Sequence, residues 1–112
     1  MWQAELSWMI VAEPDPGDVI FHVSGEIDLL AEPSFQAHVG TLLASGPGCL
    51  IIDLSQVSFM GATGLSMLIR ARGAAAQYGT AVKLRSPSPP AARPLEITGL
   101  NRLFDVLPPA PE

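Results

Sequence analysis

The sequence has one cysteine, few positive charges and no long hydrophobic run. Cys49 alone cannot form a disulfide within the chain. Acidic residues interrupt the apolar runs, none of which approaches the roughly 20 residues needed to span a bilayer, so we expect no membrane insertion. The chain has 6 Lys and Arg against 11 Asp and Glu, a formal net charge of -5, which opposes the neutralisation of phosphates that nucleic-acid binding requires. The composition therefore argues against a direct nucleic-acid partner.

The amino-terminal segment MWQAELSW also lacks the basic region and the following apolar stretch that mark a secretory leader. Together with the single cysteine, this favours a cytoplasmic location. Cys49 opens an apolar run, so we expect a small buried hydrophobe rather than a reactive thiol.

The 112 residues, 48% hydrophobic and 15% charged, fit one globular domain. Two strand candidates, residues 4–12 and 18–26, flank a turn with two prolines and Gly17, which predicts a hairpin. A helix with Pro33 in its first turn and Gly46 at its end should cover the sheet. Its apolar face is formed by Phe35, Val39, Leu42 and Leu43, which recur at helical spacing.

The remaining segments predict strands alternating with helices. CLIIDL is typical of a buried central strand, and a helix should follow over residues 62–78. AVKL and LFDVL are short strand candidates on either side of the helical segment in SPSPPAARPLEITGL. Pro94 lies four residues after Pro90, so this third helix should start late, with Pro94 in its first turn or at a distorted entry.

The predicted order is therefore β-β-α-β-α-β-α-β. Right-handed crossovers make the central strands parallel, while the hairpin adds an antiparallel strand. The expected fold is a single α/β domain with a mixed β-sheet and helices packed against it. We place this domain at residues 1–107, followed by a Pro-rich tail at residues 108–112.

Three segments in chain order resemble the hallmarks of one family. VSGEIDLLAEPSF, CLIIDLSQVSFMGATGLSML and LEITGLNRLF are similar to successive motifs of the STAS domain, in particular of the stand-alone anti-sigma factor antagonists of bacteria. The resemblance implies a regulator that captures an anti-sigma factor, often a serine kinase with an ATPase-type fold, and so frees a sigma factor for transcription. An accessory STAS subunit or docking module of a transport or multiprotein signalling complex is the alternative.

The resemblance also implies a phosphorylation switch at the start of the second helix, and there the sequence departs from the family pattern. The usual acceptor position holds Ala62, which has no hydroxyl, so the switch cannot operate at that residue. Thr63 is the only acceptor left within the motif GATGL. We favour a Thr63 hydroxyl that satisfies a local backbone donor, with phosphorylation of Thr63 as the alternative.

Binding crevices of such sheets tend to lie at the carboxyl ends of the strands, where GEID and GATGL both fall. At ~100° per residue, Thr63 shares an outward polar stripe with Ser66, Arg70 and Gln77. A second, apolar face should hold Leu65, Leu68, Ile69 and Ala76, with Arg72 beside it. The predicted partner-binding residues are Asp28, Gly61, Ala62, Thr63, Gly64, Ser66 and Arg70.

Catalytic and metal chemistry have little support in the sequence. Glu26, Asp28 and Asp53 are expected to gather near the second helix, but no His or Cys joins them at ligand spacing, so we expect no metal and a structural role for Asp53. His22 and His38 have no Ser or Cys in a nucleophile arrangement, which argues against an enzyme. GATG is too short for a phosphate-binding loop and lacks the following Lys, so no cofactor is expected. Nucleotide binding is the alternative, and it rests only on the general affinity of helix N-termini for anions.

Overall fold

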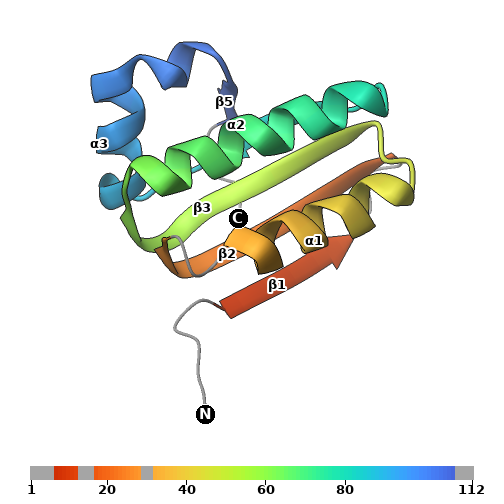
Figure 1. Ribbon diagram of the computed structural model, residues 1–112, viewed down its shortest axis with the longest axis horizontal. Helices are drawn as coiled ribbons and strands as arrows, with labels where there is room; N and C mark the ends of the chain where they lie inside the picture. The colour runs from red at the N-terminus through yellow and green to blue at the C-terminus, as the bar shows by residue number, and fades with distance from the viewer. Residues whose placement is uncertain (1–6, 13–16, 29–31, 108–112) are drawn as a thin grey trace.

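The computed structural model describes residues 7–12, 17–28 and 32–107 of the chain. Its elements follow the predicted order, with one additional 3-10 helix before the last strand (Figure 1). They are β1 (Ser7–Ala12), β2 (Asp18–Ile27), α1 (Glu32–Ala44), β3 (Cys49–Met60), α2 (Ala62–Gln77), β4 (Ala81–Arg85), α3 (Pro89–Thr98), η2 (Leu100–Arg102) and β5 (Asp105–Leu107). The proposed tail, residues 108–112, and residues 4–6 of the first predicted strand lie outside the described residues.

The five strands form one sheet in the order β1-β2-β3-β4-β5. β1 runs antiparallel to β2, as predicted for the hairpin, and each later strand is parallel to the one before it. The mixed sheet is therefore confirmed. In Figure 1, α1 and α2 lie side by side across one face of the sheet, and α3 lies at the end of the molecule where α2 begins.

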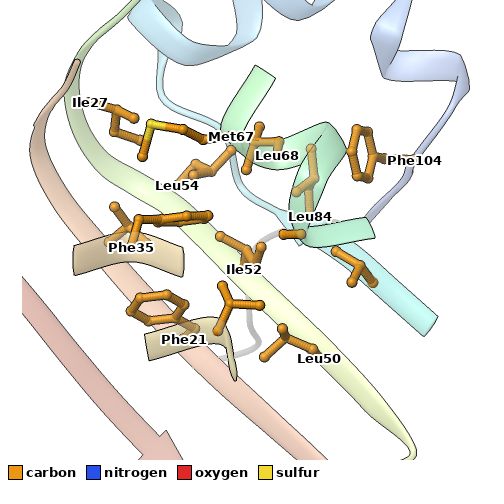
Figure 2. Close-up of a cluster of buried hydrophobic side chains, with 14 of the residues drawn as sticks. Phe21, Ile27, Phe35, Leu50, Ile52, Leu54, Met67, Leu68, Leu84 and Phe104 are labelled. Atoms are coloured by element: carbon orange, nitrogen blue, oxygen red, sulfur yellow. The ribbon is translucent and has the colours of Figure 1, made fainter. Parts of the chain in front are cut away.

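The core lies between the sheet and the helices (Figure 2). The predicted apolar face of α1 is confirmed, because Phe35, Val39, Leu42 and Leu43 are all buried. The ring of Phe35 stacks on that of Phe21 from β2, with 5.5 Å between centroids. Gly46 follows α1 with a positive φ of 75°, which suits glycine at a helix end.

β3 is longer than the sequence indicated. It continues to Met60, seven residues past Asp53 and well beyond the predicted segment CLIIDL. The polar residues after Asp53 hid this extension, but Val57 and Met60 point into the core, and their burial favours continued pairing with β2. Register shifts along that pairing let the strands stay paired as far as Ile27 and Met60.

The bounds predicted for α2 are confirmed to within one residue, and its apolar face is confirmed in part, because Leu65 and Leu68 are buried as predicted. Ile69 and Ala76 are exposed, whereas Met67, Ala71 and Ala75 are buried. The buried face is therefore rotated from the predicted one toward Ala71 and Ala75. The sheet instead accepts small residues, because alanine lets the helix approach the strands closely.

α3 contradicts the expected late start. The helix begins at Pro89, and Pro94 is its sixth residue, inside the helix. Pro89 and Pro90 occupy first-turn positions, where a missing N–H costs no helical hydrogen bond. Burial of Ala91 and Leu95 against the core helps to offset the cost of Pro94. Among the described residues, no helix is long and apolar enough to cross a membrane.

Candidate functional site

The sequence-predicted site lies at one edge of the sheet, where β2 and β3 end together. Ile27 pairs with Met60, the last residue of β3, and α2 starts two residues later at Ala62. Asp28 follows β2 directly and therefore leaves the sheet at the same edge. The fold thus brings the GEID and GATGL motifs together, as the sequence indicated.

The packing around Gly64 explains why this position of GATGL holds a small residue. It is buried, and a Cβ atom there would overlap the Met60 Cγ and lie 3.2 Å from the Ile27 Cγ2. The side chains that come close to the Gly64 backbone are therefore those of the protein's own core. Gly64 faces the core, so its burial does not support the predicted contact with a partner.

Ala62 and Thr63 form the first turn of α2. Ala62 is exposed and Thr63 is half-buried, while Gly61 occupies the N-cap position and offers no capping side chain. The capping role expected for Thr63 is not seen. Within the described ranges its hydroxyl has no hydrogen-bond partner, since Thr63 lies two residues past the N-cap, inside the helix.

The outward face of α2 continues with Ser66 and Arg70, which are exposed as predicted. Arg70 forms an ion pair with Glu32 in the first turn of α1, so it ties the two helices together across the surface. With 65% of its side chain exposed, solvent screens the pair, and its contribution to stability is small. The guanidinium remains open to a further contact. Arg72 is also exposed, on the side facing β4 and β5.

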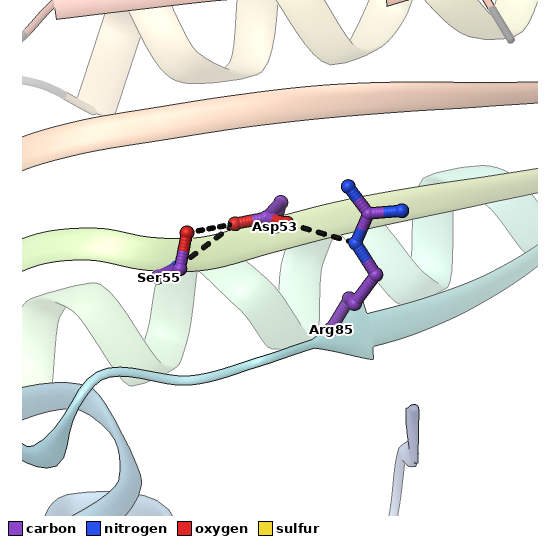
Figure 3. A network of polar contacts seen from close by, with 3 residues as sticks. All are labelled: Asp53, Ser55 and Arg85. Atoms are coloured by element: carbon purple, nitrogen blue, oxygen red, sulfur yellow. Dashed lines mark hydrogen bonds and ion pairs between the residues drawn. The ribbon is translucent and has the colours of Figure 1, made fainter. Parts of the chain in front are cut away.

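Asp53 belongs to a separate polar network in the middle of the sheet (Figure 3). Its carboxylate accepts hydrogen bonds from the Ser55 amide at 2.9 Å, the Ser55 hydroxyl at 2.6 Å and the Arg85 Nε at 2.8 Å. Burial alone would raise the pKa of Asp53, but the hydrogen bonds from Ser55 and the charge of Arg85 hold it below its usual value. This arrangement agrees with the structural role expected for Asp53.

The expected gathering of three acidic side chains does not occur. Asp53 lies beside His22 in the β2–β3 register and is seven residues from the end of its strand, whereas Glu26 lies beside Phe59. In the part of the chain that the structure describes, no group of His, Cys, Asp or Glu could hold a metal ion.

The contacts of His38 and the burial of Cys49 favour structural roles for both side chains. The Nδ1 of His38 is 2.7 Å from the Ser34 carbonyl, and its ring stacks on Phe21. Cys49 is half-buried, and this burial raises the pKa of its thiol, so the thiolate that would act as a nucleophile is disfavoured.

The structure adds a feature that the sequence analysis missed. An open groove of about 690 Å³ lies between the start of α2 and α3. Its lining is mostly apolar and includes Phe59, Ala62, Leu65, Pro90, Pro94 and Ile97. The Pro-rich stretch and Phe59 before GATGL could be seen in the sequence, but nothing local indicated that they line one groove.

The STAS-domain family model matches residues 9–110. The chain belongs to the STAS domain family. The match includes both strands that end at the GEID and GATGL motifs and all three α-helices, so the candidate site lies within the matched STAS domain.

Several relatives of this STAS domain are named anti-sigma factor antagonists. The chain is 30% identical to the anti-sigma-F factor antagonist RsfB of Mycobacterium tuberculosis over 79% of its own length and 71% of the relative. It is also 30% identical to the anti-sigma-B factor antagonist of Bacillus subtilis, over 80% of this chain and 81% of that protein. The crystal structure of an anti-sigma factor antagonist from Mycobacterium paratuberculosis superimposes with a TM-score of 0.78 at 29% identity, covering 91% and 85% of the two chains.

Proposed function

We propose that this STAS domain is an anti-sigma factor antagonist, which regulates transcription by binding an anti-sigma factor at the start of α2. The observation that carries the proposal is the agreement of its relatives, which are named antagonists of anti-sigma factors at about 30% identity over most of the chain. The open edge formed by Asp28 and the first turn of α2 supports a protein-binding role.

The proposed contact surface consists of Asp28, Gly61, Ala62, Thr63, Ser66 and Arg70. Exposed Ala62 and Ser66 can meet a partner backbone closely, because neither side chain is large. The Arg70 guanidinium can donate to a second carboxylate while it keeps its ion pair with Glu32. We propose a cytoplasmic protein without catalytic activity or cofactor that acts only by occupying the anti-sigma factor.

The usual phosphate switch cannot operate at Ala62, since an alanine side chain carries no hydroxyl. Thr63 remains the alternative acceptor: its hydroxyl has no partner among the residues that the structure describes. A phosphate there would add about -1.5 to -2 charges, and the helix dipole would stabilise this charge by only ~0.3–1 kcal/mol. Phosphorylation would therefore weaken binding of the anti-sigma factor. We therefore propose that the protein binds its anti-sigma factor without being phosphorylated.

Affinity capture from the native host tests the proposal. The tagged protein should recover an anti-sigma factor, identified by mass spectrometry and by its binding of a sigma factor in a separate assay. Recovery of a transporter subunit in its place would support the accessory role and overturn the proposal. The recovered anti-sigma factor can then be titrated against variants by calorimetry.

Thr63→Glu should weaken binding of the recovered anti-sigma factor by about tenfold or more, because the new carboxylate lies in the proposed interface. Gln77→Glu is the matched control, since it adds the same charge at the exposed far end of the same helix. Equal affinities of Thr63→Glu and Gln77→Glu would show that the start of α2 is not the contact surface.

A further inference from the structure

The groove between α2 and α3 joins the proposed contact surface. Ala62 belongs to both, and Leu65 on the next turn of α2 forms part of the groove wall. On the opposite wall, Ile97 exposes 78% of its surface, and Phe59 exposes 52% at the entrance. Large apolar side chains that stay so exposed beside a groove mark a surface that binds a partner more often than an inert one.

One charge accompanies this apolar surface. Of the described residues that line the groove, Arg93 alone is charged, and it forms no ion pair with any of them. The chain as a whole carries a formal net charge of -5, whereas the described lining of the groove carries one positive charge and no negative one. A ligand that fits both features has apolar side chains and a nearby carboxylate.

We infer that the groove holds an amphipathic segment of the anti-sigma factor, whose apolar side chains lie between α2 and α3 and whose carboxylate pairs with Arg93. The inference rests on the proposed function and names the chemistry of the partner at that site. A helix or short peptide fits because the groove is open to the surface and lies between two helices. Continuity through Ala62 allows one partner to cover both surfaces.

Ala62 fits this arrangement. Its methyl group lines the groove together with proline and isoleucine side chains, so a charged group at residue 62 would interrupt an apolar wall. An apolar contact thus takes the position at which the family resemblance implies a phosphate acceptor.

Site-specific photo-cross-linking in the native host tests the inference. The photoreactive residue p-benzoylphenylalanine replaces Ile97 in the groove, Ser66 on the outer face of α2, or Tyr78 at the other end of α2. Ile97 and Ser66 should cross-link the same anti-sigma factor, and the peptide captured at Ile97 should contain apolar residues and an Asp or Glu. Tyr78 is exposed as well, but it lies outside both proposed surfaces and should give no such product.

The possible failures differ. Cross-linking of an anti-sigma factor at Ser66 but not at Ile97 would leave the proposed function standing and overturn the groove inference. A cross-link at Ile97 to a small molecule or a second copy of this chain would also overturn it. If neither position captures an anti-sigma factor, the proposed function fails, and the inference that rests on it fails as well.

Affinity measurements with the captured protein give a second test. Ile97→Asp should weaken binding by about tenfold or more, whereas Tyr78→Asp, the matched control, should leave it within about twofold. Arg93→Glu should slow association and reduce its dependence on salt. Exposed positions of this kind tolerate substitution, so circular dichroism should show all three variants folded. An unchanged affinity for Ile97→Asp would overturn the inference.

Discussion

Two glycines of α2 offer a direct test of how this helix meets the sheet. Gly64 faces the core, where an added Cβ would overlap Met60, whereas Gly73 is exposed and a Cβ there would have no neighbour within 4 Å. Replacing either residue with alanine makes the same chemical change in the same helix. The two variants therefore differ only in what the new methyl group meets.

The magnitudes favour opposite effects. Alanine is about 1 kcal/mol more favourable than glycine inside a helix, so Gly73→Ala should raise the free energy of unfolding by about that amount. Overpacking a well-packed core costs about 1–3 kcal/mol. Met60 is only 3% exposed and has little room to move away from the new methyl group. Gly64→Ala should therefore lower the free energy of unfolding, by up to ~2 kcal/mol after the gain in helix propensity.

Urea unfolding followed by circular dichroism measures both variants against the wild type. We expect the midpoints to move in opposite directions, with the two free energies of unfolding separated by about 1–3 kcal/mol. Thermal midpoints should differ in the same order. If Gly64→Ala proves as stable as Gly73→Ala, the close approach of α2 to Met60 and Ile27 does not limit the size of residue 64, and the packing argument fails.

Three further predictions follow from the polar network, the third helix and the phosphate position. The pKa of Asp53 is lower in the folded than in the unfolded protein, so the ionised carboxylate stabilises the fold above the ordinary carboxyl pKa of about 4. This stabilisation is lost as the pH falls through the folded pKa. The free energy of unfolding of Asp53→Asn should therefore fall less steeply with acid than that of the wild type. Pro94→Ala should raise the free energy of unfolding by about 2 kcal/mol in urea, since the helix regains a donor; a lower value would show that the proline ring contributes more by packing. Ala62→Ser, incubated with ATP and the recovered anti-sigma factor, should gain a phosphate by intact-mass measurement, whereas the wild type should not; an unmodified Ala62→Ser would argue against a kinase partner.

The sequence predicted the element order because periodic patterns and turn residues act locally. The four buried residues of α1 repeat at helical spacing, and glycines follow α1, α2 and α3 with positive φ. The prediction for α3 failed because it considered only the hydrogen bond that Pro94 removes. Ala91 and Leu95 belong to a core whose other members come from β2, α1, β3, α2 and β4 and include Phe104, so the tertiary contribution could not be read from that segment.

The candidate site shows the same division between local and distant causes. Asp28 and GATGL could be placed together from strand order alone, because the ends of adjacent parallel strands share an edge. The partner of Asp53 could not be found in this way: Arg85 lies 32 residues further along the chain and meets Asp53 only through the β3–β4 register. The groove likewise depends on α3 folding back beside α2.

The small residues of GATGL therefore have two separate causes. Gly64 must be small because Met60 and Ile27 occupy the space beneath it, and this requirement would persist in a protein with no partner. Ala62 is exposed at the groove, and our proposal attributes its small apolar side chain to a partner that binds from outside. Substitutions at residue 64 should alter stability first, whereas substitutions at residue 62 should alter binding with little change in stability. One motif thus combines a packing requirement and a recognition surface, which unfolding and affinity measurements can separate.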